Sequence, residues 1–112
     1  MKVLASILAL GLLAAPALAA TKSFKDVSVV DVKCSSKVAA NPDAHTRSCA
    51  LMCEKSGYGV ITADKKFLKF DAEGNAKIAQ QLKDSKETDH LRVDVKGDVQ
   101  GDTLKVESIK LL

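Results

Sequence analysis

The residues of this chain best suited to chemistry lie between positions 34 and 53. They are three cysteines, a histidine and a methionine: Cys34, His45, Cys49, Met52 and Cys53. Soft sulfur ligands select Cu(I), zinc or iron–sulfur clusters. Three cysteines with one histidine form an established zinc ligand set, whereas the thioether of Met52 suits Cu(I). The residue types therefore predict a copper or zinc ion as the cofactor, either carried as cargo or held as a structural site.

The spacing of these residues predicts that most of them share one helix face. His45, Cys49 and Cys53 recur every four residues. In a helix, each step of four residues advances about 40° around the axis. Met52 would then project about 20° to the other side of His45, on the same face. Cys34 would have to reach this face from elsewhere.

A helix is expected from Pro42 to about Ser56. Asn41 can cap free backbone N–H groups, Pro42 fits the first helical position, and Asp43 complements the positive end of the helix dipole. Gly57 fits the left-handed position at which helices often stop.

Two other roles for the cysteines are consistent with the sequence. The same helix face could pack on a sheet, because free cysteines often behave as small buried hydrophobic residues. Cys34 could then form a disulfide with Cys49 or Cys53, worth roughly 2–4 kcal/mol of stability, and leave one thiol unpaired. Redox-active thiols are the third interpretation. The alternative to a metal-binding protein is therefore a disulfide-stapled structural or protein-interaction module without metal.

An enzyme is the least supported class. The chain has no C-x-x-C redox motif, no nucleophile elbow around a serine and no glycine-rich phosphate loop. Acidic and basic residues are interspersed and the net charge is only +3. With few aromatic residues for base stacking, this balance argues against nucleic acid as a partner.

The first 20 residues read as a cleavable signal peptide. Lys2 precedes an apolar run from Val3 to Ala15, and Ala17-Leu18-Ala19 provides the small residues typical of a cleavage site. The run is short for a membrane span, which needs roughly 20 residues, so no stable membrane insertion is expected after cleavage. The pattern predicts a periplasmic or secreted protein whose partner is a metal ion or another periplasmic protein.

Residues 21–112 are expected to form one domain containing five strands. A strand over Phe24–Lys33, with a bulge around Val29-Val30, is followed by the predicted helix. Gly59–Thr62 and Phe67–Phe70 form a hairpin, and Leu91–Leu112 forms another. Between the hairpins, Asn75 would cap a short helix that buries Ile78, Ala79 and Leu82.

This order predicts an α+β fold. It is expected to be a small, partly open, five-stranded barrel like the OB-fold, with an inserted N-terminal helix and a second short helix. An α+β sandwich with helices on one face is the alternative.

The segment from His45 to Gly57 and the final hairpin resemble a group of small exported bacterial proteins of unknown function. These proteins carry a Cys…His-x-x-x-Cys-x-x-x-Cys-x-x-x-Gly signature ahead of an OB-like β region, and Cys34, His45, Cys49, Cys53 and Gly57 match it. The resemblance covers most of residues 21–112. It implies the order of the parts and no particular activity. The chain departs from a fuller pattern in having no second cysteine upstream at the first strand.

Overall fold

The computed structural model describes residues 21–112, so the predicted signal peptide lies outside the described part of the chain. Five strands form a closed barrel in the order β1-β2-β3-β5-β4. They are β1 (Thr21–Asp31), β2 (Tyr58–Ile61), β3 (Phe67–Phe70), β4 (Arg92–Gln100) and β5 (Thr103–Leu111). The helices are α1 (Ser35–Val38), α2 (Arg47–Met52) and α3 (Ala72–Asp84), with short 3-10 turns at Pro42–Ala44 and Glu54–Ser56.

The barrel is closed, so the expectation of a partly open barrel is wrong. All neighbouring strands pair antiparallel except β3 and β5, which pair parallel through Lys69–Thr103 and Phe70–Leu104. This short parallel contact joins the two hairpins, and β1 pairs with both β2 and β4 to complete the circle. The predicted combination of helices with five strands in one domain is confirmed, and so are both hairpins.

The core fills the barrel and extends under α3. Alternate residues are buried along β3, β4 and the first half of β5, as expected for strands with one covered face, whereas all four residues of β2 are buried. The most completely buried members of the core are Val29, Ala50, Tyr58, Val60, Ile78, Leu82, Leu91, Val93 and Leu104. The helix α3 packs mainly on β5.

The first strand bulges at a different place from the one expected. Its register with β4 shifts between Phe24 and Val27, where Asp26 has a positive φ of 52°. Val29 and Val30 instead continue regular pairing with β2. The strand end is buried on both faces, from Val27 to Asp31, which is why the two neighbouring valines do not need a bulge to be covered.

The helix α3 begins three residues before the predicted cap. Asp71 is the cap, and its Oδ1 accepts hydrogen bonds from Gly74 N (3.1 Å) and Val106 N (3.2 Å). Asn75 lies inside the helix, where its Oδ1 accepts a hydrogen bond from the backbone N of Tyr58 at 2.8 Å. The polar residue that resembled a cap thus joins α3 to β2.

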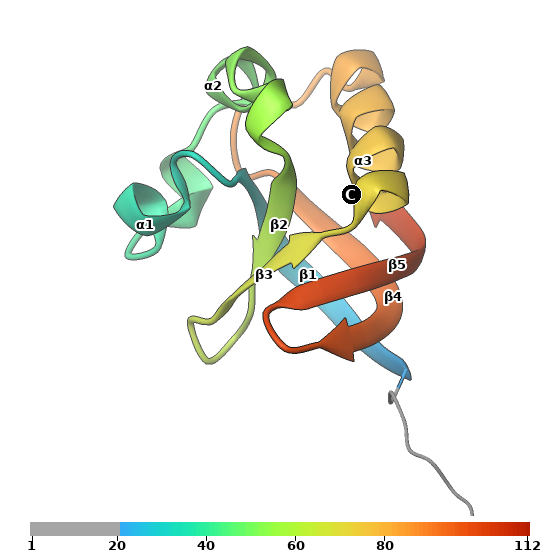
Figure 1. Ribbon diagram of the computed structural model, residues 1–112. Coiled ribbons are helices and arrows are strands. Elements are labelled where there is room, and N and C mark those ends of the chain that lie inside the picture. The colour runs from blue at the N-terminus through green and yellow to red at the C-terminus, as the bar shows by residue number, and fades with distance from the viewer. Residues whose placement is uncertain (1–20) are drawn as a thin grey trace, which may run out of the picture.

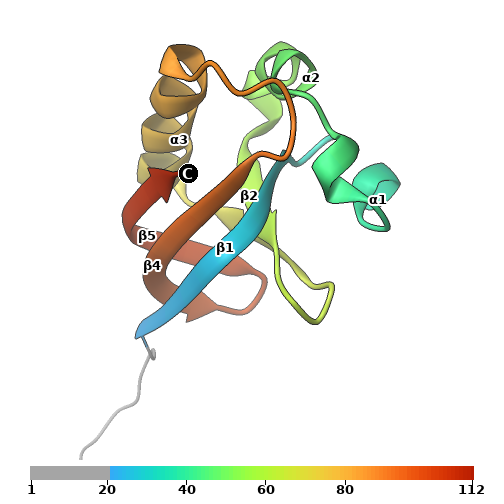
Figure 2. The same cartoon turned by 180° about the vertical axis from the view of Figure 1, so that it is seen from behind.

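Helices α2 and α3 lie at one end of the barrel, and the β2–β3 and β4–β5 loops lie toward the other (Figure 1). The reverse view shows β1 running to the helical end, where the chain turns into α1 (Figure 2). Within residues 21–112, no helix combines the length and apolar character needed to cross a membrane. The residues of the candidate functional site, Asp31, Cys34 and Cys53, lie at this helical end.

Candidate metal centre

Asp31 is the last residue of β1 and its side chain is fully buried. It faces Tyr58 across the β1–β2 ladder, at the point where both strands meet the helical end of the barrel. Its Oδ2 accepts a hydrogen bond from the backbone N of Cys34 at 3.0 Å. A buried carboxylate is costly unless it is paired or bound to a metal, so its surroundings indicate what the site does.

Backbone hydrogen bonds bring the turn after β1 beside the segment that precedes β2. Val32 N donates to Gly57 O at 2.9 Å, and Lys33 N donates to Ser56 Oγ at 3.2 Å. Ser56 Oγ also donates to Cys53 O at 2.8 Å. The strand pairing of β1 with β2 therefore continues into the loops, and Cys34 is placed next to Cys53.

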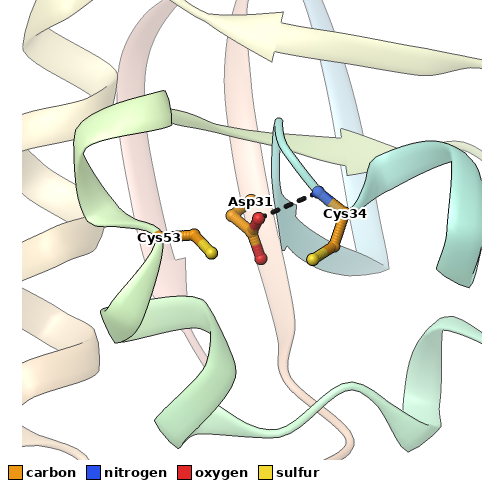
Figure 3. A group of neighbouring side chains, drawn as sticks. All are labelled: Asp31, Cys34 and Cys53. Atoms are coloured by element: carbon orange, nitrogen blue, oxygen red, sulfur yellow. Dashed lines mark hydrogen bonds between the residues drawn. The ribbon is translucent and has the colours of Figure 1, made fainter.

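Cys34, Cys53 and Asp31 form one compact group. One carboxylate oxygen of Asp31 and the two sulfur atoms all lie within 4.8 Å of one another. Figure 3 shows the two cysteines approaching the Asp31 carboxylate from opposite sides. Asp31 is buried, whereas both cysteines are half-buried. An ion at the centre would be held from inside the fold and remain reachable from solvent.

His45 contacts this group through Asp31. Its Nε2 lies 2.6 Å from Asp31 Oδ1, and both side chains are buried. Ligating carboxylates are commonly hydrogen-bonded by a further residue that fixes their orientation. His45 therefore contacts Asp31 but is not one of the three residues whose candidate ligand atoms converge.

The single helix expected from Pro42 to Ser56 is wrong. The chain forms a 3-10 turn over Pro42–Ala44, becomes extended at His45 (φ −72°, ψ 128°), and starts α2 only after Thr46. Thr46 is the cap, because its hydroxyl accepts a hydrogen bond from Cys49 N at 3.1 Å. His45 thus lies outside the helix that carries Cys49, and the shared face predicted for the two residues does not exist.

Cys49 and Met52 are separated from the group of Asp31, Cys34 and Cys53. Both residues are exposed, and Met52, a large apolar residue, is 83% exposed to solvent. The C-terminal residue of the predicted stripe, Cys53, is the cap that ends α2. Of the five residues predicted as ligands, the structure brings together Cys34 and Cys53, adds His45 through Asp31, and leaves Cys49 and Met52 on the surface.

The electrostatics of the group suit a cation. Burial raises the pKa of the Cys34 thiol, and the negative charges of Asp31 and Cys53 raise it further. The pKa of Tyr58 is raised to about 12, mainly by burial and then by the negative charges of Glu54, Asp31 and Cys53. A metal ion would offset the repulsion between these negative groups, because it is the largest local charge in such a site.

Asp31 is the residue that reasoning from the sequence missed. It stands in the run Val29-Val30-Asp31-Val32, at the point where the predicted strand approaches Cys34. A carboxylate inside a β-branched run is the signal that could have identified it, because such a side chain must find a partner when the strand is buried.

No family model matches the sequence. The searches of curated proteins and of solved structures likewise found no similar protein.

Proposed function

We propose that this chain is an exported protein that binds a zinc or copper ion through Asp31, Cys34 and Cys53, with zinc preferred. The observation that carries the proposal is the convergence of one carboxylate oxygen and two sulfur atoms within 4.8 Å. His45 holds the Asp31 carboxylate in place from behind. Export rests on the sequence of residues 1–20.

Zinc is preferred because of the mixed ligand set. Zinc accepts thiolate, imidazole and carboxylate ligands, whereas Cu(I) favours thiolate and thioether. The sequence favoured copper as much as zinc because of Met52 and the predicted export, but Met52 is exposed on α2. The buried carboxylate of Asp31 lies in the group and the thioether of Met52 does not, so the ligand set favours zinc, the harder of the two ions.

Three protein ligands leave a fourth position of a tetrahedral zinc site for water or for a group from a partner. Structural zinc sites are usually closed by four protein ligands. The half-buried cysteines and the fourth position therefore favour the role of a carrier that passes the ion to another periplasmic protein. In this role the chain binds the ion and does not transform a substrate.

The proposed fold type is an OB-like barrel with an inserted segment between β1 and β2. The strand order β1-β2-β3-β5-β4 and the helix between β3 and β4 support it. Residues 32–57 form the insertion, and this segment supplies both cysteines of the group.

A disulfide-stapled module without metal remains the second candidate, because the Cys34 and Cys53 sulfur atoms are close to each other.

The test of the metal site is to purify the full chain under reducing, oxygen-free conditions and titrate it with Zn(II) and Cu(I) against a chromophoric chelator. Zinc should bind with about one ion per chain, and Cys34→Ser and Cys53→Ser should each remove tight binding.

The matched control is Cys49→Ser, which removes a thiol of the same chain outside the group and should leave zinc binding unchanged. Unchanged zinc affinity in a Cys34→Ser/Cys53→Ser variant would rule out this site.

A further inference from the structure

The two sulfur atoms of the group are placed for a reaction with each other as well as for metal binding. They lie within 4.8 Å, and both thiols are half-buried, so that an oxidant in solution can reach them. A disulfide requires an S–S distance of about 2.05 Å. The sulfur atoms must therefore move toward each other, and rotation about the Cα–Cβ bonds, from one staggered rotamer to another, must bring them into bonding contact.

The two cysteines lie at the ends of short helical segments, outside the strands. Cys34 precedes α1, a four-residue helix with no buried residue. Cys53 lies between the end of α2 and the following 3-10 turn. Neither residue is fixed inside a strand ladder, yet the bonds from Val32 to Gly57 and from Lys33 to Ser56 hold the two segments side by side.

We infer that Cys34 and Cys53 form a reversible dithiol–disulfide couple, and that their disulfide excludes the metal ion. This inference rests on the proposed metal site. The same two thiolates serve both states, so that binding of the ion and formation of the disulfide compete. Oxidation leaves Asp31 as the single anionic ligand, because disulfide sulfurs carry no negative charge.

The oxidant is a disulfide, either a small molecule or a protein. One cysteine thiolate of the pair attacks a sulfur of the oxidant, a mixed disulfide forms, and one thiolate leaves. The second cysteine thiolate then attacks the sulfur of the first, and the second thiolate leaves. Two thiols of the chain lose two protons and two electrons, and the oxidant disulfide becomes two thiols. A bound metal ion is released in the process.

The couple matters because of where the chain is predicted to work. Disulfides form and persist in exported proteins, so the metal-free dithiol would be oxidised there. A bound ion stabilises the reduced state by mass action, because it binds that state and not the oxidised one. Loading of the ion would therefore protect the pair, and oxidation would empty the site.

The experiment compares the full chain in its two redox states. Reduced protein is loaded with zinc, treated with oxidised glutathione, alkylated and analysed by mass spectrometry. We expect a Cys34–Cys53 disulfide, an alkylated Cys49, loss of bound zinc, and recovery of zinc binding after reduction. Preloading with excess zinc should slow formation of the disulfide.

Assignment of the disulfide needs a variant, because cleavage after lysine and arginine leaves Cys49 and Cys53 on one peptide. The Cys49→Ser variant retains the pair and should behave as the parent does. The Cys34→Ser variant should form no disulfide within the chain.

The outcomes separate this inference from the proposed function. If reduced protein binds zinc and no Cys34–Cys53 disulfide forms, or if the oxidised protein binds zinc equally well, the inference is wrong and the metal site stands. If the disulfide forms but reduced protein does not bind zinc, the metal site and the inference both fail, and the disulfide is a structural staple.

Discussion

The Nε2 atom of His45 lies 2.6 Å from Oδ1 of Asp31, and both side chains are buried at the end of the first strand. The other oxygen, Oδ2, accepts a hydrogen bond from Cys34 N. The carboxylate is thus held at both oxygen atoms, which orients it for the proposed ion. A ligand held in this way loses little conformational freedom on binding, which favours affinity.

Removal of the His45 side chain should weaken zinc binding. Partners that orient a ligand typically contribute 10–100-fold in affinity, and we expect a loss of about that size in His45→Ala, measured by chelator competition. His45→Gln can still donate a hydrogen bond to Asp31 and should lose less. Equal zinc affinity in the alanine variant and the parent would show that His45 only fills space.

The negative charge of Asp31 should determine whether the site binds zinc more tightly than Cu(I). Asp31→Asn keeps the shape of the side chain but removes its negative charge, and carboxylate is a ligand for zinc rather than for Cu(I). We expect zinc affinity to fall by roughly 100-fold or more, above the cost of losing a supporting partner, while Cu(I) affinity changes little. The ratio of the two affinities is the measurement. An equal loss for both ions would contradict the zinc preference.

The sequence was sufficient to predict the two hairpins, but not which cysteine lies beside Cys34, nor the path of the chain between β1 and β2. Strand periodicity predicted both hairpins because β3, β4 and the first half of β5 bury alternate residues. The helix over Pro42–Ser56 failed because Thr46 offers a second cap, and the bond from His45 to buried Asp31 holds that residue extended. A local pattern does not report such a tertiary contact, and so Cys49 was assigned to a site that it does not join.

Gly57 should be essential for the geometry between Cys53 and β2. Its φ of 86° and ψ of 178° fall in a region that is essentially restricted to glycine. A Cβ there would lie 3.1 Å from Asn75 Nδ2. Gly57→Ala should therefore cost about 1–3 kcal/mol of unfolding free energy, measured by urea denaturation, and should also weaken zinc binding because Gly57 O anchors Val32.

The matched control for Gly57 is Gly101, which also has a positive φ but has no atom near its potential Cβ. Gly101→Ala should lower stability through backbone strain and leave zinc affinity unchanged, since it lies in the β4–β5 turn. If both variants affect zinc affinity equally, Gly57 has no specific role at the site.

Asp43 and Arg92 should make the stability of the fold depend on acid pH. Arg92 donates to both carboxylate oxygens, from Nε at 3.0 Å and from the second guanidinium nitrogen at 2.8 Å. These bonds hold the pKa of Asp43 below its ordinary value of 3.8. A lowered folded-state pKa gives stability that is present above pH 3.8 and is lost as the pH falls through the folded value.

Asp43→Asn should accordingly reduce the unfolding free energy at neutral pH by about 1 kcal/mol, a low value because the pair is partly solvated. The difference from the parent should shrink in acid, where Asp43 is protonated. Denaturation curves over the acid range measure it. A difference that stays constant down to the lowest pH would show that the charge of Asp43 contributes nothing.

Tyr58 should report directly on burial beside the site, because it is the only tyrosine and the chain has no tryptophan. Its hydroxyl donates to Ala50 O at 2.8 Å, and burial is the main cause that raises its pKa to about 12 from an ordinary 10.0. In metal-free protein, phenolate absorbance should therefore rise with a midpoint near 12 while circular dichroism stays native, and near 10 in urea.

Because the folded-state pKa of Tyr58 is raised, the stability that Tyr58 contributes is fully present below pH 10 and is lost as the pH rises through about 12. Tyr58→Phe should be less stable by about 1 kcal/mol at neutral pH and should lack this part of the alkaline loss, whereas the lysines titrate alike in both proteins. A folded-state midpoint near 10 would mean that α2 does not cover Tyr58, and that Cys53 at the end of α2 is not held where metal binding requires it.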